Sequence, residues 1–399
     1  MRLAFIQFGD FRDAFERFRQ GGGETYYAQR YSVDFVERLA ERCDFLGVCA
    51  MLGETAYEAT VTERLHSACI PRLLGGRLDD AAIVALLNRW RPTHIILQTP
   101  SRGVLAWALR RKIAVLPLLA DSWRTTGVKA RLDGFRHARL FNDPRIAVVA
   151  NHNAPASLSL KRIGVRPEKI VPWDWPHALV PEDHPVKSPP LESAQAPLLL
   201  FVGQLTEAKG AGECIGAAAI LKERGVDFRM KLIGGGDFEA RAKDEVRARG
   251  LADRVEIAGR RPHAEVIEAG RAASLALVPT HHAYPEGLPM TIYEALATRT
   301  PLIVSDHPMF LPYLANAPAA KVVPEKRPDA LADAIASFLA DAAAYRRASE
   351  ATEETWRRIK CDLTWGALIE AWLKDPARAR ERLRDYALDR RLETLGMTD

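Results

Sequence analysis

The cysteine content excludes two common ways of stabilising a protein. Five cysteines occur in 399 residues, an odd number, and no two of them form a CxxC pair. Neither a zinc site nor a disulfide framework is expected from this pattern, and a reducing compartment suits it best. The five positions are Cys43, Cys49, Cys69, Cys214 and Cys361.

Long hydrophobic runs are also absent. The first residues, MRLAFIQFGDFRDAF, have a short apolar start that ends at Asp10, which is typical of a strand and not of a signal peptide. No run approaches the roughly 18 apolar residues that a membrane span needs. We therefore expect a cytoplasmic protein. A peripheral contact with the inner face of the membrane is compatible with this pattern.

The chain carries no large excess of one charge. Lys and Arg together number 56 and Asp and Glu number 51, which gives a net charge of +5. Nucleic-acid binding would call for a concentrated basic stripe, so we expect no nucleic-acid partner. The small excess suits an anionic small ligand or a weak membrane contact.

What the sequence does contain is an alternation of apolar runs and amphipathic stretches. Short continuous apolar runs between helices are typical of a parallel sheet covered on both faces. In the first half, the expected strands are 3–8, 45–52, 93–99, 113–120 and 146–150. In the second half, they are 197–203, 228–234, 255–259, 275–279 and 301–306.

Two doubly wound, Rossmann-like α/β domains are expected from this alternation. Residues 176–197 are too rich in proline for a helix or a central strand, and we place the linker there. The N-terminal domain would span 1–175 and the C-terminal domain 198–374. Residues 375–399 would form a C-terminal helix that crosses to the N-terminal domain. Ligands of such sheets bind beyond the carboxyl ends of the strands, so we expect a site in a cleft between the domains.

Two loops that follow strands in the second half are candidates for phosphate binding. The loop 203–210 carries Lys209 just before a predicted helix, where a cation and free backbone N–H groups could hold a phosphate. The loop 234–236 is Gly-Gly-Gly, which lets a ligand approach the backbone closely. A solvated surface lysine and a plain tight turn explain the two loops equally well.

The stretch 285–297, PEGLPMTIYEALA, places two carboxylates on either side of a helix start. Glu286 lies in the loop, and the bend at Gly287 and Pro289 directs the positively polarised helix N-terminus toward the cleft. Glu294 follows within the helix, where it could accept hydrogen bonds from two adjacent hydroxyl groups. The alternative is a helix-capping acid and a solvated surface acid.

This stretch resembles the E-x7-E motif of the retaining glycosyltransferases of family 4. FVGQLTEAKG, LIGGG, VEIAG, LVPT and PLIVSDHP match the same family in order and spacing. The resemblance implies a GT-B fold, in which two Rossmann-like domains face each other across a cleft. It also implies that the nucleotide-sugar donor is bound mostly by the C-terminal domain.

The resemblance assigns a role to each matching position. Lys209 would bind the donor diphosphate, Glu294 the ribose, and Glu286 the transferred sugar. Met290 and Thr291 would lend backbone amides to the phosphates, and Arg260 or Arg261 would lie near the base. The other expected donor-binding residues are Gly22 and Gly23 from the N-terminal domain, with Gln204, Gly235, Gly287 and Leu288.

Two positions depart from the family pattern. Gln204 stands where the family usually has an arginine beside the lysine, and it adds no charge. Many family members also have a histidine in the N-terminal domain, and the matching stretch here offers Asp121, Ser122 or Arg124 instead. We take Asp121 as the third catalytic candidate, in addition to Lys209 and Glu286. His152, His281 and His282 are alternatives, although a lone histidine is more often a structural hydrogen-bonding group.

The resemblance implies a retaining hexosyltransferase that uses a UDP- or GDP-linked sugar. The acceptor would be a glycan or a lipid-linked sugar, in the synthesis of cell-surface or exported polysaccharide. Family members mostly need no metal, and no carboxylate pair with DxD spacing follows a predicted strand, so we expect neither metal nor cofactor. A nucleotide-sugar epimerase and a non-catalytic sugar-nucleotide-binding subunit are the alternatives.

Two segments could touch a membrane or an acceptor. Phe8, Phe11, Phe15 and Phe18 recur at helical spacing, which indicates a core-facing stripe or a hydrophobic lip beside the acceptor site. The C-terminal stretch RARERLRDYALDRR is basic and helical. It would pack on the N-terminal domain, face anionic lipid, or remain solvated.

Overall fold

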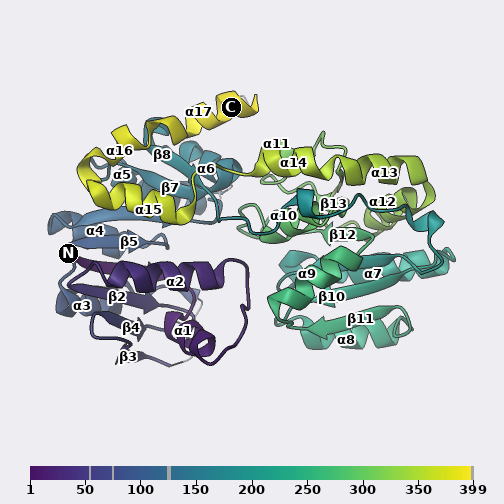
Figure 1. Cartoon of the computed structure of the whole chain (residues 1–399), viewed down its shortest axis with the longest axis horizontal. Coiled ribbons are helices and arrows are strands. Elements are labelled where there is room, and N and C mark those ends of the chain that lie inside the picture. Colours follow the sequence, from purple (N-terminus) through teal and green to yellow (C-terminus); the bar gives the residue numbers. More distant parts are fainter. Residues whose placement is uncertain (54, 74–75, 124–126, 397–399) are drawn as a thin grey trace. The chain divides into compact units, whose positions relative to one another are not determined.

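The computed structural model describes the whole chain except residues 54, 74–75, 124–126 and 397–399. It consists of two compact units (Figure 1). The first unit comprises Met1–Pro176 and Cys361–Asp399, and the second comprises His177–Lys360. The first unit is therefore built from both ends of the chain.

The first unit is organised around an eight-stranded sheet with the order β3-β4-β2-β1-β5-β6-β7-β8. Its strands pair in parallel except for β3, which runs antiparallel to β4 at the edge. The strand of sequence FLGVCA is buried throughout, as expected where helices cover both faces of a sheet. The strands are β1 (Arg2–Gln7), β2 (Phe45–Ala50), β3 (Tyr57–Thr60), β4 (Leu65–Cys69), β5 (His94–Leu97), β6 (Ala114–Leu119), β7 (Val149–His152) and β8 (Ile170–Trp173).

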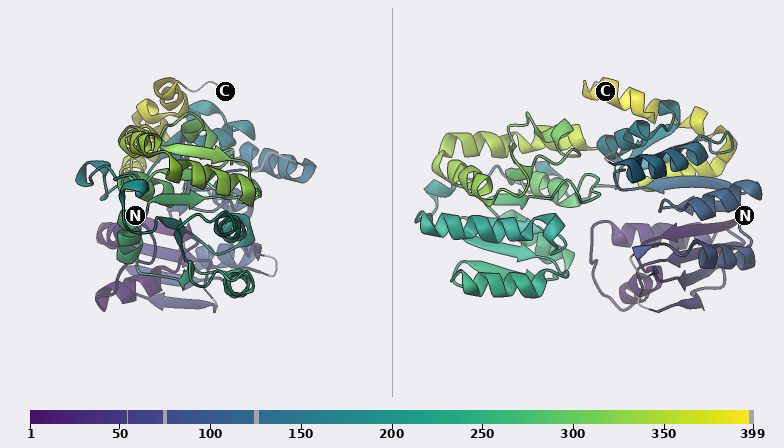
Figure 2. Two further views of the ribbon diagram at one scale, coloured as in Figure 1. Left: turned by 90° about the vertical axis from the view of Figure 1, so that its right-hand side faces the viewer. Right: turned by 180° about the vertical axis from the view of Figure 1, so that it is seen from behind.

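Several helices of the first unit begin at a polar side chain that accepts a backbone N–H. Asp10, Asp79 and Ser101 accept from residues three positions ahead, which stabilises the first turn. Figure 2 shows the helices of this unit on both faces of its sheet. They are α1 (Phe11–Arg19), α2 (Gln29–Ala40), α3 (Asp80–Trp90), α4 (Arg102–Arg110), α5 (Val128–Phe141) and α6 (Asn153–Arg162).

The second unit contains a six-stranded, wholly parallel sheet with the order β11-β10-β9-β12-β13-β14. Its strands are β9 (Leu198–Val202), β10 (Arg229–Ile233), β11 (Val255–Gly259), β12 (Leu275–Val278), β13 (Leu302–Ser305) and β14 (Ala320–Val323). Its helices are α7 (Ala211–Glu223), α8 (Glu239–Ala248), α9 (His263–Ala272), α10 (Met290–Ala297), α11 (Leu311–Leu314), α12 (Pro328–Ala340), α13 (Ala342–Glu350) and α14 (Thr352–Ile359). Because the strands are parallel, the loops that follow them gather at one edge of the sheet.

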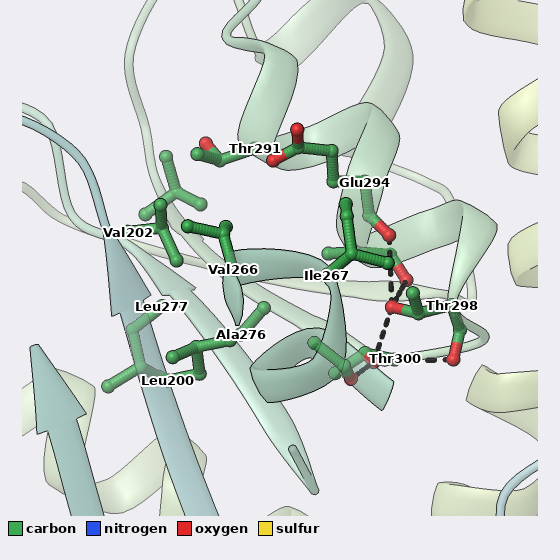
Figure 3. A pocket seen from close by; sticks show the side chains of 13 residues that line it. Leu200, Val202, Val266, Ile267, Ala276, Leu277, Thr291, Glu294, Thr298 and Thr300 are labelled. Atoms are coloured by element: carbon green, nitrogen blue, oxygen red, sulfur yellow. Dashed lines mark hydrogen bonds between the residues drawn. The ribbon is translucent and has the colours of Figure 1, made fainter. Parts of the chain in front are cut away.

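Helix α9 lies over an apolar pocket on one face of this sheet (Figure 3). Leu200 and Ala276 of the strands and Val266 of α9 line this space. The helix is held at its carboxyl end by Lys187, whose Nζ donates to three backbone carbonyl oxygens at 2.6 to 2.9 Å. Lys187 comes from the proline-rich stretch, which thus packs on the second unit.

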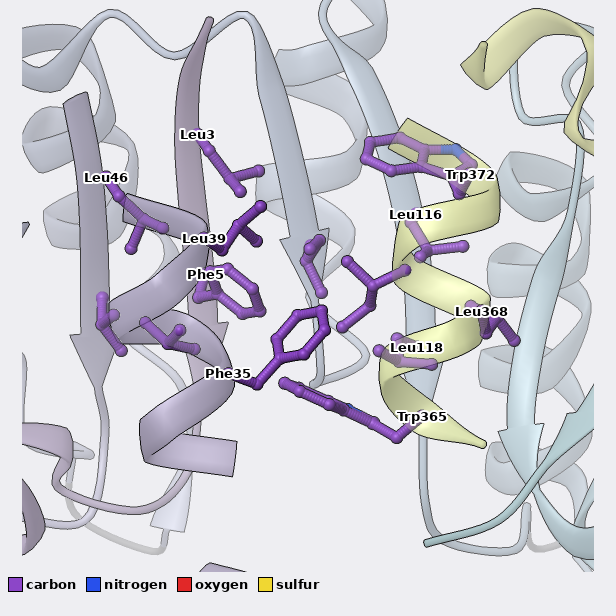
Figure 4. Close-up of a cluster of buried hydrophobic side chains, with 14 of the residues drawn as sticks. Leu3, Phe5, Phe35, Leu39, Leu46, Leu116, Leu118, Trp365, Leu368 and Trp372 are labelled. Carbon is purple, nitrogen blue, oxygen red and sulfur yellow. The ribbon is translucent and has the colours of Figure 1, made fainter. Parts of the chain in front are cut away.

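The last helices complete the core of the first unit. In α15 (Trp365–Lys374), the ring centroid of Trp365 lies 5.1 Å from that of Phe35 and 5.5 Å from that of Trp175. Figure 4 shows Trp365, Leu368 and Trp372 of α15 (yellow) among side chains of the N-terminal segment. α16 (Ala379–Arg382) and α17 (Leu388–Leu395) follow in the same unit.

The structure differs from the predicted domain boundaries at the C-terminus. We expected residues 361–374 in the C-terminal domain, but they belong to the first unit. Asp174 explains this placement, since its backbone N–H and carbonyl oxygen bond to Leu363 and Trp365 and its carboxylate accepts the N–H of Cys361. The predicted linker 176–197 also belongs to the second unit from His177 onward.

The predicted N-terminal aromatic stripe faces the core in part. Phe11 and Phe15 of α1 are buried in the first unit, and Phe18 is partly buried against the same core. Phe8 lies before α1, where the guanidinium of Arg72 covers its ring. Across the part of the chain that is described, no helix combines the length and the apolar character that crossing a bilayer requires.

We expect Trp365→Ala to destabilise the first unit by about 3–5 kcal/mol, because it leaves a large cavity between α15 and α2. Urea unfolding followed by far-ultraviolet circular dichroism measures the loss. Tyr386→Ala is the control, since that ring is 42% exposed in the same C-terminal segment. Equal unfolding midpoints for the two variants would contradict the structural role of Trp365.

Candidate functional site

Three loops of the second unit touch through their backbones at the carboxyl edge of the sheet. Gly234, with φ 147°, lies so close to Gly203 that a Cβ atom would overlap the carbonyl oxygen of Gly203. Gly210, with φ 81°, lies against the carbonyl oxygen of Pro279 in the same way. A side chain at either position would separate the loops, so glycine is required for this close approach.

Lys209 and Glu286, two of the predicted catalytic residues, form an ion pair at this edge. Their side chains are only 13% and 11% exposed. The ammonium group also lies 4.5 Å from the ring centroid of Tyr284, a favourable cation–π distance. Thr206 fixes the lysine loop, since its hydroxyl accepts the backbone N–H of Lys209 at 3.3 Å.

A buried histidine holds the loop that carries Glu286. His307 Nδ1 accepts the N–H of Met309 at 3.2 Å, so its Nε2 carries the proton and donates to the carbonyl oxygen of Tyr284 at 3.1 Å. Burial lowers the pKa of His307 to about 4. The ring is therefore neutral near pH 7, and this single tautomer fixes the loop just before Glu286.

Helix α10 begins four residues after Glu286 of the ion pair. Gly287 and Leu288 are buried in the turn, and Pro289 precedes the first helical residue. Pro289 has no side-chain acceptor, so it cannot cap the backbone N–H groups of Met290 and Thr291 in the first turn of the helix. These groups and the helix dipole give the position a partial positive charge.

Glu294 lies one turn further along α10 and pairs with His263 at the start of α9. The Nε2 atom of His263 is 2.6 Å from a carboxylate oxygen of Glu294. Figure 3 shows Glu294 and Thr291 together at one end of the apolar pocket. This contact with His263 was not predicted from the sequence.

Two further predicted donor-binding positions meet at the neighbouring loop. A Cβ atom on Gly235 would lie 2.9 Å from Nε of Arg260, so the arginine side chain covers this glycine. Arg261, the alternative, lies 4.0 Å from Glu265. Gln204 is connected to the ion-pair region, because its side-chain oxygen accepts the hydroxyl of Tyr284 at 3.3 Å.

The predicted donor-binding glycines of the first unit, Gly22 and Gly23, lie in the loop that follows α1. Arg17 and Arg30 donate to the carbonyl oxygens of Gly23 and Gly22, which fixes the loop.

The remaining N-domain candidates follow β6. Asp121 is exposed there, and its backbone carbonyl oxygen accepts the side-chain amide of Asn151 at 3.0 Å. Ser122 lies beside it and is partly buried. Arg124 lies outside the described residues.

Each of the three alternative histidines lies within hydrogen-bond distance of a carboxylate. His152 is buried at the start of α6 with Nε2 3.2 Å from Asp174, a structural position. His281 and His282 belong to the second unit, where they pair with Glu213 at 2.9 Å and Asp306 at 2.8 Å. Within the described residues, no three His, Cys, Asp or Glu side chains converge as metal ligands would.

Three residues of the site were missed in the sequence: Tyr284, His263 and His307. Each lies in, or at the end of, a loop that follows a strand of the second unit, namely β12, β11 and β13. The rule that ligands bind beyond the carboxyl ends of parallel strands could have selected all three.

Known proteins match the segment that carries these loops. Residues 186–355 match the family model described as glycosyl transferases group 1. The amylovoran biosynthesis glycosyltransferase AmsK of Erwinia amylovora is 37% identical over 112 residues, which are 27% of this chain and 28% of that protein. The putative colanic acid biosynthesis glycosyltransferase WcaL of Escherichia coli K12 is 35% identical over 160 residues, 39% of this chain and 38% of that protein. These matches therefore span less than half the length of either relative.

A solved structure extends the likeness to nearly the whole chain. Anabaena HepE, solved in complex with UDP and glucose, superimposes with a TM-score of 0.65 at 14% identity, covering 94% of this chain and 100% of that one. A sequence identity this low supports a shared fold only. The superposition confirms the predicted GT-B fold class, with its two Rossmann-like domains built on mainly parallel sheets. Residues 186–355 thus match the group 1 glycosyl transferases, and they do so within a chain that has a GT-B fold.

Proposed function

We propose that the protein transfers a sugar from a nucleotide-diphosphate donor to a glycan or lipid-linked acceptor. The observation that carries the proposal is the pairing of Lys209 with Glu286 beside the uncapped N-terminus of α10. This arrangement lies within the segment that matches the group 1 glycosyltransferases. The names of two relatives, which refer to amylovoran and colanic acid, support a role in polysaccharide synthesis.

The chemistry of the reaction suits the charges at this position. As the bond between the sugar and the diphosphate breaks, negative charge grows on the leaving phosphate oxygens. A lysine ammonium and the N–H groups of a helix N-terminus stabilise that charge without reorganisation. The diphosphate would replace Glu286 as the partner of Lys209, and Glu286 would be released to accept hydrogen bonds from the hydroxyls of the sugar.

The rest of the donor would lie along the same edge of the sheet. Glu294 would accept hydrogen bonds from the two ribose hydroxyls, with His263 holding its other side. The base would lie near Gly235 and Arg260, where the guanidinium can stack on a planar ring. HepE was solved with UDP and glucose, so a UDP-sugar is the first donor to test, with GDP-sugars second.

The finer features of the reaction come from the family 4 resemblance. We propose retention of the anomeric configuration, transfer of a hexose, and no need for a metal ion. In this mechanism, the acceptor proton passes to the departing diphosphate oxygen, and Asp121 is the N-domain candidate that would face the sugar. Gln204, which lacks the charge of the usual arginine, favours a non-catalytic donor-binding subunit as the second candidate.

Two measurements test the proposal in sequence. A thermal-shift screen with UDP-, GDP- and ADP-sugars should find one nucleotide that stabilises the protein by about 2.7 kcal/mol at 100 times its dissociation constant. Product analysis of that donor, alone and with glycan acceptors, then separates transfer from epimerisation and from binding without reaction. If no nucleotide shifts the melting curve, the proposed donor site is wrong.

Lys209→Ala should lower turnover by about 10²–10³-fold, because it removes one preorganised positive charge from the leaving group. Release of the nucleoside diphosphate measures the effect. Lys243→Ala, which removes an exposed lysine of α8, is the matched control and should retain full activity. Equal rates for the two variants would contradict the role of Lys209.

Glu294→Gln should weaken binding of the nucleoside diphosphate by about 10–100-fold, because the ribose loses a charge-assisted hydrogen bond. Titration calorimetry with the nucleotide and with its 2′,3′-dideoxy analogue isolates the contact. The native protein should prefer the ribonucleotide, and the variant should bind both equally. A variant that keeps the full preference would place the ribose elsewhere.

His307 should make the protein less stable as the pH falls. Its folded pKa of about 4 lies below the ordinary value of 6.5, so unfolding takes up a proton between these values. Its contribution to stability is complete above pH 6.5 and is lost as the pH falls to 4. Urea unfolding of the native protein and of His307→Gln should show a gap that narrows over this range; a constant gap would refute the assignment.

A further inference from the structure

One face of α5 presents apolar side chains to solvent. Val128, Leu132 and Phe135 are 85%, 47% and 63% exposed, and their spacing of four and three places them in one stripe along the helix. We propose that this face binds the surface of an anionic phospholipid bilayer. The inference goes beyond sugar transfer and does not depend on it.

The exposure of this stripe is a fixed feature of the fold, because the opposite side of α5 is firmly packed. Gly134 lies so close to Ile163 that a Cβ atom would be 2.8 Å from its side chain. The two ring nitrogens of His137 lie 2.9 Å from the carbonyl oxygen of Asp133 and 3.1 Å from that of Pro100. Trp123 packs on His137 and Phe141. The helix therefore cannot turn its apolar stripe inward.

Cationic side chains flank the stripe. Lys129, Arg131, Arg136 and Arg139 are all exposed on α5. The one acid of this helix, Asp133, is 3.6 Å from Arg102 and 3.4 Å from His137. This helix therefore presents a positive surface.

The surrounding sequence carries the same charge. Residues 100–166 contain 13 lysines and arginines, three aspartates and no glutamate, whereas the whole chain has a net charge of only +5. The segment that includes α5 is thus strongly positive because it contains few acidic residues, although it holds only 13 of the 56 lysines and arginines.

This combination fits a bilayer surface better than other partners. A helix that lies in the plane of a membrane inserts its apolar side chains between the lipids and places lysine and arginine among the headgroups. Nucleic acid would pair with the charges but leave Val128 and Phe135 in water. Three apolar side chains alone give weak binding, so the attraction should depend on anionic lipid and on salt.

Vesicle co-sedimentation tests this surface without any nucleotide sugar. The native protein should bind vesicles of equal parts phosphatidylglycerol and phosphatidylcholine at least about ten-fold more tightly than vesicles of phosphatidylcholine alone. Raising the salt from 0.1 to 0.5 M should reverse most of this preference. Donor binding, measured separately by thermal shift, should stay unchanged.

Two α5 variants divide the interaction into its parts. Leu132→Ser with Phe135→Ser removes two of the three apolar side chains of the stripe. Arg131→Gln, Arg136→Gln and Arg139→Gln together remove three charges. Each variant should lose about ten-fold or more of its vesicle affinity. Since all five side chains are exposed, the variants should melt like the native protein.

Matched changes elsewhere serve as controls. Leu191→Ser removes a side chain of the second unit that is 63% exposed, and Arg241→Gln, Lys243→Gln and Arg247→Gln remove three cations from α8. Both controls should bind vesicles like the native protein. The proposal is overturned if the native protein ignores anionic vesicles, or if the α5 variants and their controls bind equally. It is also overturned if the α5 variants abolish only self-association in sedimentation velocity.

Discussion

Backbone contact between neighbouring loops is the constraint on which the donor-side site depends. The loops after β9 and β10 meet where Gly203 and Gly234 touch, and the loops after β9 and β12 meet where Gly210 touches Pro279. No side chain fits at these contacts, so the loops hold one spacing. Lys209 and Glu286 come from two of these loops and are far apart in the sequence. The fixed spacing of the loops brings their side chains together.

The charges at this edge are balanced within the second unit itself. Lys209 is neutralised by Glu286, Glu294 is held by His263, and His281 pairs with Glu213. Little unpaired charge is therefore left on partly buried groups, which would be costly. An anionic ligand that enters such a site would replace Glu286 beside Lys209, and the cost of removing the Lys209 ammonium from water has already been met on folding.

The sequence was informative where local pattern and chemistry coincide. Lys209 and Glu286 stand in short loops between a buried strand and a helix, and that context was readable from apolar runs and glycines. Trp365 was assigned to the wrong domain because its partners, Phe35 and Trp175, are distant in the chain and leave no local signal. The helix before Gly22 was readable, because Phe11, Phe15 and Phe18 recur at helical spacing and α1 spans Phe11–Arg19. The exposed apolar stripe of α5 could not be predicted from the sequence, because tertiary packing decides which face of the helix is buried.

The divided first unit has a consequence for how the protein is made. The second unit is one continuous segment, whereas the core of the first needs α15, which follows that segment in the chain. During synthesis, the N-terminal segment therefore leaves the ribosome before its last layer exists, and the apolar surface that will receive Trp365 stays exposed until α15 has been made. The second unit can fold in that interval. The first unit, although its N-terminal segment is made earlier, would therefore complete its fold later, and chaperones would act on that segment.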